Sequence, residues 1–198
     1  MKDHTQELTR LAEAIGFSYI KEVNMQALIP RNEVRAMCRE NRCQRYKKSW
    51  SCPPSPICGS PERMRERFAA YSHGLLVQTC GRMADAFDMD IIRETEKRQK
   101  RNFDALVRQT GLLGVSCLPL SSGSCTRCRK CTYPDRPCRF PDRLYPSMEA
   151  CGLWVSEVCS SSGLDYKHGE NTITYTACLL FDQKTPEIET DHRERNDT

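Results

Sequence analysis

The chain has 198 residues, of which 38% are hydrophobic and 28% are charged, with a net charge of +4. This length and composition predict one globular domain with a buried core. Thirteen cysteines are many for this size, and their number is odd. A secreted disulfide scaffold favours a shorter chain, an even count and a signal peptide, whereas this sequence begins with polar residues. No apolar run approaches the roughly 20 residues of a membrane span. We therefore expect a cytoplasmic protein whose thiols stay reduced, and no association with membranes.

Hydrophobic periodicity and turn residues divide the chain into alternating helices and strands. Spacings of three and four predict helices, and short apolar runs between glycine and proline predict strands. The helices are expected at residues 3–15, 32–37, 61–71, 89–112 and 147–161. The strands are expected at residues 18–28, 74–80, 115–120 and 172–181.

This alternation predicts an α/β fold, with a mixed sheet of about four strands flanked by helices and two cysteine-rich metal-binding loops. We expect mixed or parallel pairing, the strand at 74–80 in a central position, and the loops near one edge of the sheet. Residues 1–182 are expected to form the single domain. Residues 183–198 are charged and polar and are expected to form a disordered tail.

Four cysteines within residues 125–138 form what we call the C-terminal cysteine group: Cys125, Cys128, Cys131 and Cys138. The first three are spaced at steps of three, as in bacterial-type ferredoxins, where such thiols surround a 4Fe-4S cluster. Structural zinc sites instead use two short cysteine pairs from separate hairpins, in which a third thiol at this spacing is redundant. The spacing therefore favours an iron–sulfur cluster over zinc, which stays the alternative.

Four further cysteines form the N-terminal cysteine group: Cys38, Cys43, Cys52 and Cys58. Pro53 and Pro54 follow the third of them and stiffen an extended path, which helps to hold a thiolate at a fixed distance. The group predicts a second metal site, whose fourth ligand is Cys58 or Cys80.

The remaining cysteines are Cys117 and Cys178 in expected strands and Cys151 and Cys159 in an expected helix, and we interpret all four as small core residues. Glu149 is expected to form a hydrogen bond at the start of its own helix. Trp50, beside Cys52, is interpreted as a packing residue that can shield a cluster from water.

Two stretches resemble the signatures of one family. Residues 43–54 read CQRYKKSWSCPP, against a family pattern of Cys-x-x-Tyr-Gly-Lys-x-Trp-x-Cys-Pro-Pro. The second signature combines GSCTRCRKC at residues 123–131, PCR at 137–139 and PSMEACG at 146–152. Together they resemble the predicted metal-binding proteins of domain of unknown function family 2284, over nearly all of residues 7–182. The chain departs from that pattern at Lys47, and after Pro54, where the family often places a later cysteine near the position of Met64. The resemblance implies metal binding.

The leading functional hypothesis is a protein with two 4Fe-4S clusters that transfers electrons. Basic residues gather around the cysteines, and they favour an anionic cluster and an acidic redox partner, such as a ferredoxin, a flavodoxin or a partner enzyme. Two alternatives stay open. One is a zinc-stabilised structural or nucleic-acid-binding module, with nucleic acid ranked second as a ligand for the basic residues. The other is an iron–sulfur enzyme with an open iron site, where Glu149 or a nearby arginine assists.

Overall fold

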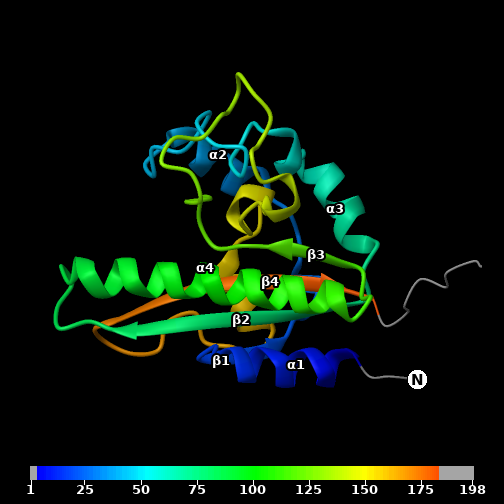
Figure 1. Cartoon of the computed structure of the whole chain (residues 1–198), viewed down its shortest axis with the longest axis vertical. Coiled ribbons are helices and arrows are strands. Elements are labelled where there is room, and N and C mark those ends of the chain that lie inside the picture. Colours follow the sequence, from blue (N-terminus) through cyan, green and yellow to red (C-terminus); the bar gives the residue numbers. More distant parts are fainter. Residues whose placement is uncertain (1–3, 183–198) are drawn as a thin grey trace, which may run out of the picture.

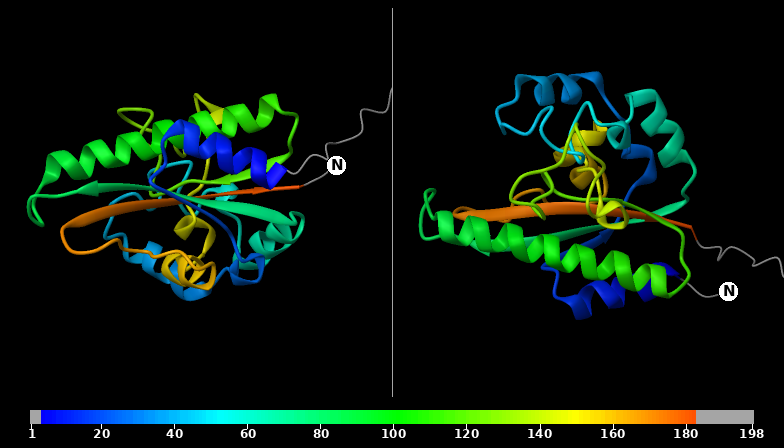
Figure 2. Two further views of the ribbon diagram at one scale, coloured as in Figure 1. Left: turned by 90° about the horizontal axis from the view of Figure 1, so that it is seen from below. Right: turned by 45° about the horizontal axis from the view of Figure 1, so that its top comes forward.

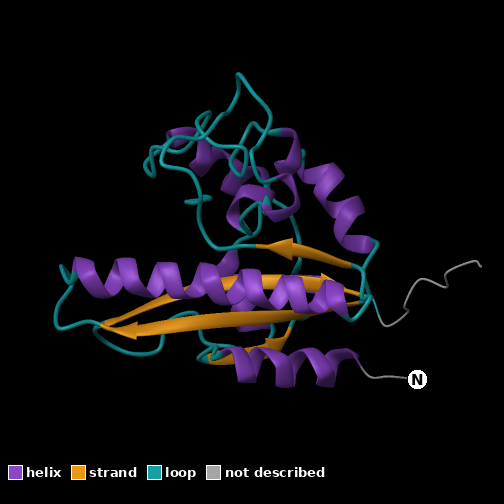
Figure 3. Ribbon diagram, viewed as in Figure 1, coloured by secondary structure: helices purple, strands orange, loops and turns teal. Residues whose placement is uncertain are grey.

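The computed structural model describes residues 4–182 and has one four-stranded sheet with helices on both faces (Figures 1 and 3). The strand order is β1-β2-β4-β3. The strands are β1 (Tyr19–Glu22), β2 (His73–Arg82), β3 (Cys117–Leu120) and β4 (Thr172–Phe181). The predicted fold class is confirmed, and β2 lies at the centre of the sheet as expected. The predicted tail at 183–198 lies outside the described residues.

The expected mixed or parallel pairing is wrong, because all three strand pairs are antiparallel. Strand β2 leads into α4 (Met89–Leu112), which returns along the sheet, so that β3 runs in the same direction as β2. These three elements resemble a crossover unit, as the alternation predicted. However, β4 is inserted between β2 and β3 and pairs with both. The last strand of the chain thus turns an expected parallel pair into two antiparallel ones.

Helices α1 (His4–Ile15) and α4 cover one face of the sheet (Figure 2). Successive side chains of a strand point to opposite faces, so Leu75 and Val77 pack against Phe103 and Leu106 of α4, while Leu76 packs on the other side. The described helices do not include one long and apolar enough to cross a membrane.

The opposite face carries α2 (Asn32–Glu40), α3 (Pro61–Ala69) and α5 (Val155–Ser161), together with both cysteine loops (Figures 1 and 2). The core beneath them includes Met64, Phe68, Met148 and Leu153. The two loops lie beyond the β3 edge of the sheet, at the top of Figure 1, so residues far apart in the sequence come side by side there.

Several boundaries differ from the predictions. The helix expected at 147–161 is divided into a short 3₁₀ turn, η4 (Glu149–Cys151), and α5. Gly152 separates them with a φ of 90°, and a Cβ at this position would lie 3.2 Å from the backbone nitrogen of Arg31. That nitrogen donates a hydrogen bond to the Gly152 carbonyl at 2.8 Å. The end of η4 is thereby connected to the segment that leads into α2.

The strand expected at 18–28 ends at Glu22, because Asn24 accepts a hydrogen bond from the Gln26 backbone and caps the 3₁₀ turn η1 (Met25–Ala27). Helix α2 extends to Glu40, three residues beyond the expected end, so Cys38 lies inside its last turn. The predicted bounds of the long helix at 89–112 and of the strand at 172–181 are confirmed.

Candidate metal centre

The four thiols of the C-terminal cysteine group line one small cavity of about 20 Å³, together with Trp50 and Leu144. The loop that carries them runs from β3 to the 3₁₀ turn η3 (Pro141–Arg143). Hydrogen bonds within the loop curl it around the cavity. The Thr132 hydroxyl donates to the Pro137 carbonyl at 2.9 Å, and the Arg139 guanidinium donates to the Lys130 carbonyl at 3.0 Å.

One hydrogen bond reaches a cysteine sulfur of this group directly. The Phe140 backbone N–H donates to Cys138 Sγ at 3.4 Å. Hydrogen bonds to sulfur stabilise a thiolate and raise the reduction potential of a cluster that it ligates. The Phe140 backbone N–H therefore favours the thiolate form of Cys138.

The N-terminal cysteine group begins in α2 and continues through a series of tight turns. Asn41 ends the helix in the left-handed conformation, and its side chain accepts a hydrogen bond from the Tyr46 backbone at 2.9 Å. Turns at Cys52 and Cys58 follow, in which each backbone N–H donates to the carbonyl three residues earlier. These turns fold residues 41–58 back toward Cys38.

The thiols of the N-terminal group lie close enough to affect one another's ionisation. Burial is the main cause that raises the pKa of Cys52 to about 11, with smaller contributions in the same direction from Cys43 and Cys38. Burial likewise raises the pKa of Cys58 to about 12, with added contributions from Cys52 and Cys38. Buried thiols near one another stay protonated unless a cation compensates the charge of their thiolates, and a bound metal ion would supply that charge.

A cation of the chain itself acts on this group: Arg35, which lies one helical turn before Cys38. Its guanidinium donates a hydrogen bond to the Ala150 carbonyl, and its charge lowers the pKa of both Cys38 and Cys58 against the effect of burial. Helix α2 thus presents a thiol and a compensating charge on the same side.

Cys151 is a neighbour of this group that sequence reasoning missed. It is fully buried in the core, as we expected, and its pKa is raised first by burial and next by the charge of Cys58. Its position inside the second signature was the available signal. Cys80, the alternative fourth ligand, lies in β2, where its Sγ accepts a hydrogen bond from Thr174 at 3.7 Å. This placement favours Cys58 over Cys80.

The two cysteine loops contact each other through residues 50 and 51. The Ser51 hydroxyl is fully buried, accepts a hydrogen bond from the Cys125 backbone N–H at 2.8 Å and lies 3.8 Å from Cys52 Sγ. The indole of Trp50 donates to the Arg136 carbonyl at 3.0 Å and packs edge-on against Tyr133 at 4.9 Å. Trp50 therefore closes the cavity of the C-terminal group rather than the neighbouring N-terminal one.

Glu149 lies between the two loops. Its backbone carbonyl is 4.0 Å from Cys38 Sγ, and its carboxyl group lies near enough to its own backbone, Ser147 and Gly123 for these groups to lower its pKa against the effect of burial. One carboxyl oxygen, Oε2, is out of contact with solvent and has no partner among the described residues. Burial raises the pKa of this carboxyl. The hydrogen bond expected at the start of its own helix stays a prediction, and the Gly123 backbone brings the loop of Cys125 close to this carboxyl.

The chemistry of the donors fits a thiophilic metal or an iron–sulfur cluster, because sulfur dominates both groups. Their arrangement is not a finished coordination sphere: within residues 4–182, no three His, Cys, Asp or Glu side chains are placed to hold a metal ion. Metal sites commonly reach their final geometry only when the metal binds. The eight thiols of the two groups lie on α2 and on the two adjoining loops.

Comparison with known protein families gives a match. The family model described as "Predicted metal-binding protein (DUF2284)" matches residues 21–181, which include both cysteine groups and all four strands except the first two residues of β1. No match was found among the curated proteins, and none among the solved structures.

Proposed function

The chain belongs to the family of predicted metal-binding proteins DUF2284, and from this premise we propose that it carries two 4Fe-4S clusters and exchanges electrons with a redox partner. The observation that supports this best is the single cavity lined by all four thiols of the C-terminal group. A 4Fe-4S cluster is commonly held by four cysteine thiolates, and this group offers four on one curled loop. The site is proposed for the cytoplasm, where thiols stay reduced.

In this proposal Cys125, Cys128, Cys131 and Cys138 hold one cluster, and Cys38, Cys43, Cys52 and Cys58 hold the other. Such clusters supply reversible one-electron transfer. The contact of Ser51 with both Cys125 and Cys52 supports two neighbouring clusters, since it joins the loops at one ligand of each.

The chain's own residues would tune and protect the C-terminal site. The Phe140 N–H stabilises the Cys138 thiolate, and the cations of the loop favour an anionic cluster. Trp50 covers the cavity and excludes water on that side. Arg35 performs a similar electrostatic role for Cys38 and Cys58.

The proposed partner is an acidic redox protein, such as a ferredoxin or flavodoxin, or a partner enzyme with an acidic surface. Arg129, Lys130, Arg136 and Arg139 are all exposed on the loop that carries the C-terminal group. Only Asp135 opposes them there. Charge complementarity of this kind accelerates association and orients the partner toward the cluster.

The test is an absorption spectrum and an electron paramagnetic resonance spectrum of anaerobically purified protein, before and after addition of dithionite. We expect broad visible absorption that bleaches on reduction, together with paramagnetic signals of reduced clusters. A protein with iron and sulfide but no reversible reduction would refute electron transfer.

A structural zinc site is the second candidate, and the small size of the cavity favours it. A volume of about 20 Å³ is the space of roughly one water molecule. A colourless protein with tightly bound zinc and no sulfide would support this function instead.

A further inference from the structure

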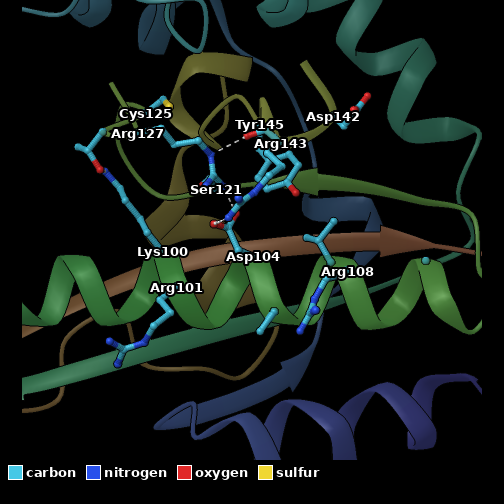
Figure 4. Close-up of a pocket in the computed structure, with 14 residues that line it drawn as sticks. Lys100, Arg101, Asp104, Arg108, Ser121, Cys125, Arg127, Asp142, Arg143 and Tyr145 are labelled. Atoms are coloured by element: carbon cyan, nitrogen blue, oxygen red, sulfur yellow. Dashed lines mark hydrogen bonds and ion pairs between the residues drawn. The ribbon is translucent and has the colours of Figure 1, made fainter. Parts of the chain in front are cut away.

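A second and much larger cavity, of about 860 Å³, lies between α4 and the loop that follows β3 (Figure 4). Its volume falls within the range of small-molecule sites, about 300–1,000 Å³. Residues 100–111 of α4 form one wall, and residues 121–127 and 142–145 form the other. We call this cavity the α4 cleft.

Positive charge predominates in the α4 cleft. Two acidic residues, Asp104 and Asp142, are outnumbered among its lining side chains, which leaves three positive charges in excess. The cationic members are Lys100, Arg101, Arg108, Arg127 and Arg143. In Figure 4 the Arg101 side chain points away from the loop, so the other four are the candidates for contact with a ligand.

Two of these arginines are held in place by one carboxylate. Arg127 pairs with one oxygen of Asp104, and Arg143 pairs with the other at 3.0 Å. The Nε of Arg127 also donates to the Arg143 carbonyl at 3.1 Å. A single carboxylate cannot neutralise two guanidinium groups, so this arrangement fixes their positions and leaves a net positive charge facing the cleft.

Lys100, at the other end of the α4 cleft, is also held in place by hydrogen bonds. Its ammonium group donates to Glu96 at 2.6 Å, to the Ser124 carbonyl at 2.5 Å and to the Thr126 hydroxyl at 3.4 Å. Arg108 differs, because it is exposed and has no hydrogen-bond or ion-pair partner within residues 4–182. Its donors are therefore available to a ligand.

We infer that the α4 cleft binds a small organic phosphate. Without Arg101 the lining side chains still carry two positive charges in excess. A phosphate monoester, with about −1.5 to −2 charges at neutral pH and three acceptor oxygens, matches this excess better than a carboxylate with its single charge. Arginine forks bind phosphate oxygens in pairs. Ala105, Val107 and Tyr145 supply apolar surface for the organic part of the molecule.

The ligand would lie against the C-terminal cysteine group, because Cys125, Arg127 and Arg143 line both cavities. The inference does not depend on which metal the cysteines bind. It requires only the folded chain, so binding can be measured independently of metal content.

The test is equilibrium dialysis of the full-length protein, purified with its own metal, against three phosphate monoesters: phenyl phosphate, adenosine monophosphate and flavin mononucleotide. Phenol, adenosine and riboflavin serve as their phosphate-free counterparts. We expect at least one phosphate to bind with a Kd below about 1 mM, and at least tenfold more tightly than its counterpart.

Three variants locate the site. Arg108→Gln and Arg143→Gln should each weaken binding by about five- to tenfold. Arg93→Gln removes the same charge from an exposed position of α4 outside the cleft and should change binding by less than about twofold. Arg108 is exposed and unpaired, so its variant keeps the test valid if Arg143→Gln misfolds.

The inference is overturned if no phosphate binds, if a phosphate-free counterpart binds equally well, or if Arg93→Gln weakens binding as much as Arg108→Gln. Phosphate binding by a protein without iron or sulfide would refute the proposed clusters and leave this site intact. A protein that contains the clusters but binds no phosphate would refute the phosphate site and leave the proposed clusters intact.

Discussion

The contact between the two cysteine loops makes Ser51→Ala the most informative single substitution. The Ser51 hydroxyl is fully buried, accepts a hydrogen bond from the Cys125 N–H at 2.8 Å and lies 3.0 Å from the Ser49 hydroxyl. Alanine removes these partners without a large change in volume. The Cys125 N–H is then left half-buried and unpaired, which costs about 1–3 kcal/mol.

The assay is anaerobic urea unfolding of the purified protein, followed by circular dichroism. With a slope of about 2 kcal/mol per molar urea, a loss of about 2 kcal/mol moves the midpoint down by roughly 1 M. Ser160→Ala is the matched control, because Ser160 is exposed and its hydroxyl bonds only within α5. We expect that control to change stability by less than about 0.5 kcal/mol.

The same substitution should loosen both metal sites, because Ser51 contacts one proposed ligand of each. We therefore expect faster release of metal to a chelator from both groups in Ser51→Ala than in Ser160→Ala. Equal midpoints for the two variants, or faster release from one group alone, would refute the view that Ser51 couples the loops.

Three further predictions concern packing, ionisation and loop closure. Gly74→Ala should destabilise the protein by about 1–3 kcal/mol in thermal unfolding, because the new Cβ would lie 2.6 Å from Val23 Cγ1. Gly111→Ala should stabilise it by about 0.5–1 kcal/mol, because the new Cβ would have no heavy atom within 4 Å. Equal effects of the two substitutions would contradict this reasoning. Burial raises the pKa of Cys117 from 9.0 to about 11. The folded state therefore keeps this proton to a higher pH than the unfolded state does, and the free energy of unfolding falls as the pH rises from 9 to 11. Cys117→Ala should reduce that fall by about 2–3 kcal/mol, measured by urea unfolding at each pH, and an unchanged fall would exclude this thiol as its source. Trp50→Phe removes the hydrogen bond to the Arg136 carbonyl and should speed tryptic cleavage of that loop about fivefold, whereas an unchanged rate would show that the indole does not hold the loop closed.

Local pattern accounts for much of the fold but not for its long-range pairing. The helix at 89–112 and the strand at 172–181 were predictable to the residue, because each is long and strongly periodic. The insertion of β4 between β2 and β3 was not, because strand order depends on contacts between distant residues. The break of the helix at Gly152 was unpredictable for the same reason, because it depends on a hydrogen bond that the Gly152 carbonyl accepts from Arg31, more than a hundred residues earlier.

The candidate site was predictable in part. Spacing alone grouped Cys125, Cys128, Cys131 and Cys138, because residues close in sequence are constrained to be close in space. The proximity of Cys151 to Cys58 and the joining of the loops by Ser51 arise only from tertiary packing. The α4 cleft could not be predicted from the sequence for the same reason, since its two walls come from a helix and a loop whose contact no local pattern encodes.

The central claim, two neighbouring cysteine sites that each hold a 4Fe-4S cluster, is tested most directly by iron and sulfide analysis of anaerobically purified protein and of two variants. We predict about eight iron and eight sulfide per chain in the wild type, and about four of each in both Cys131→Ala and Cys52→Ala. Zinc without sulfide in the wild type, or full iron content in either variant, would contradict this account.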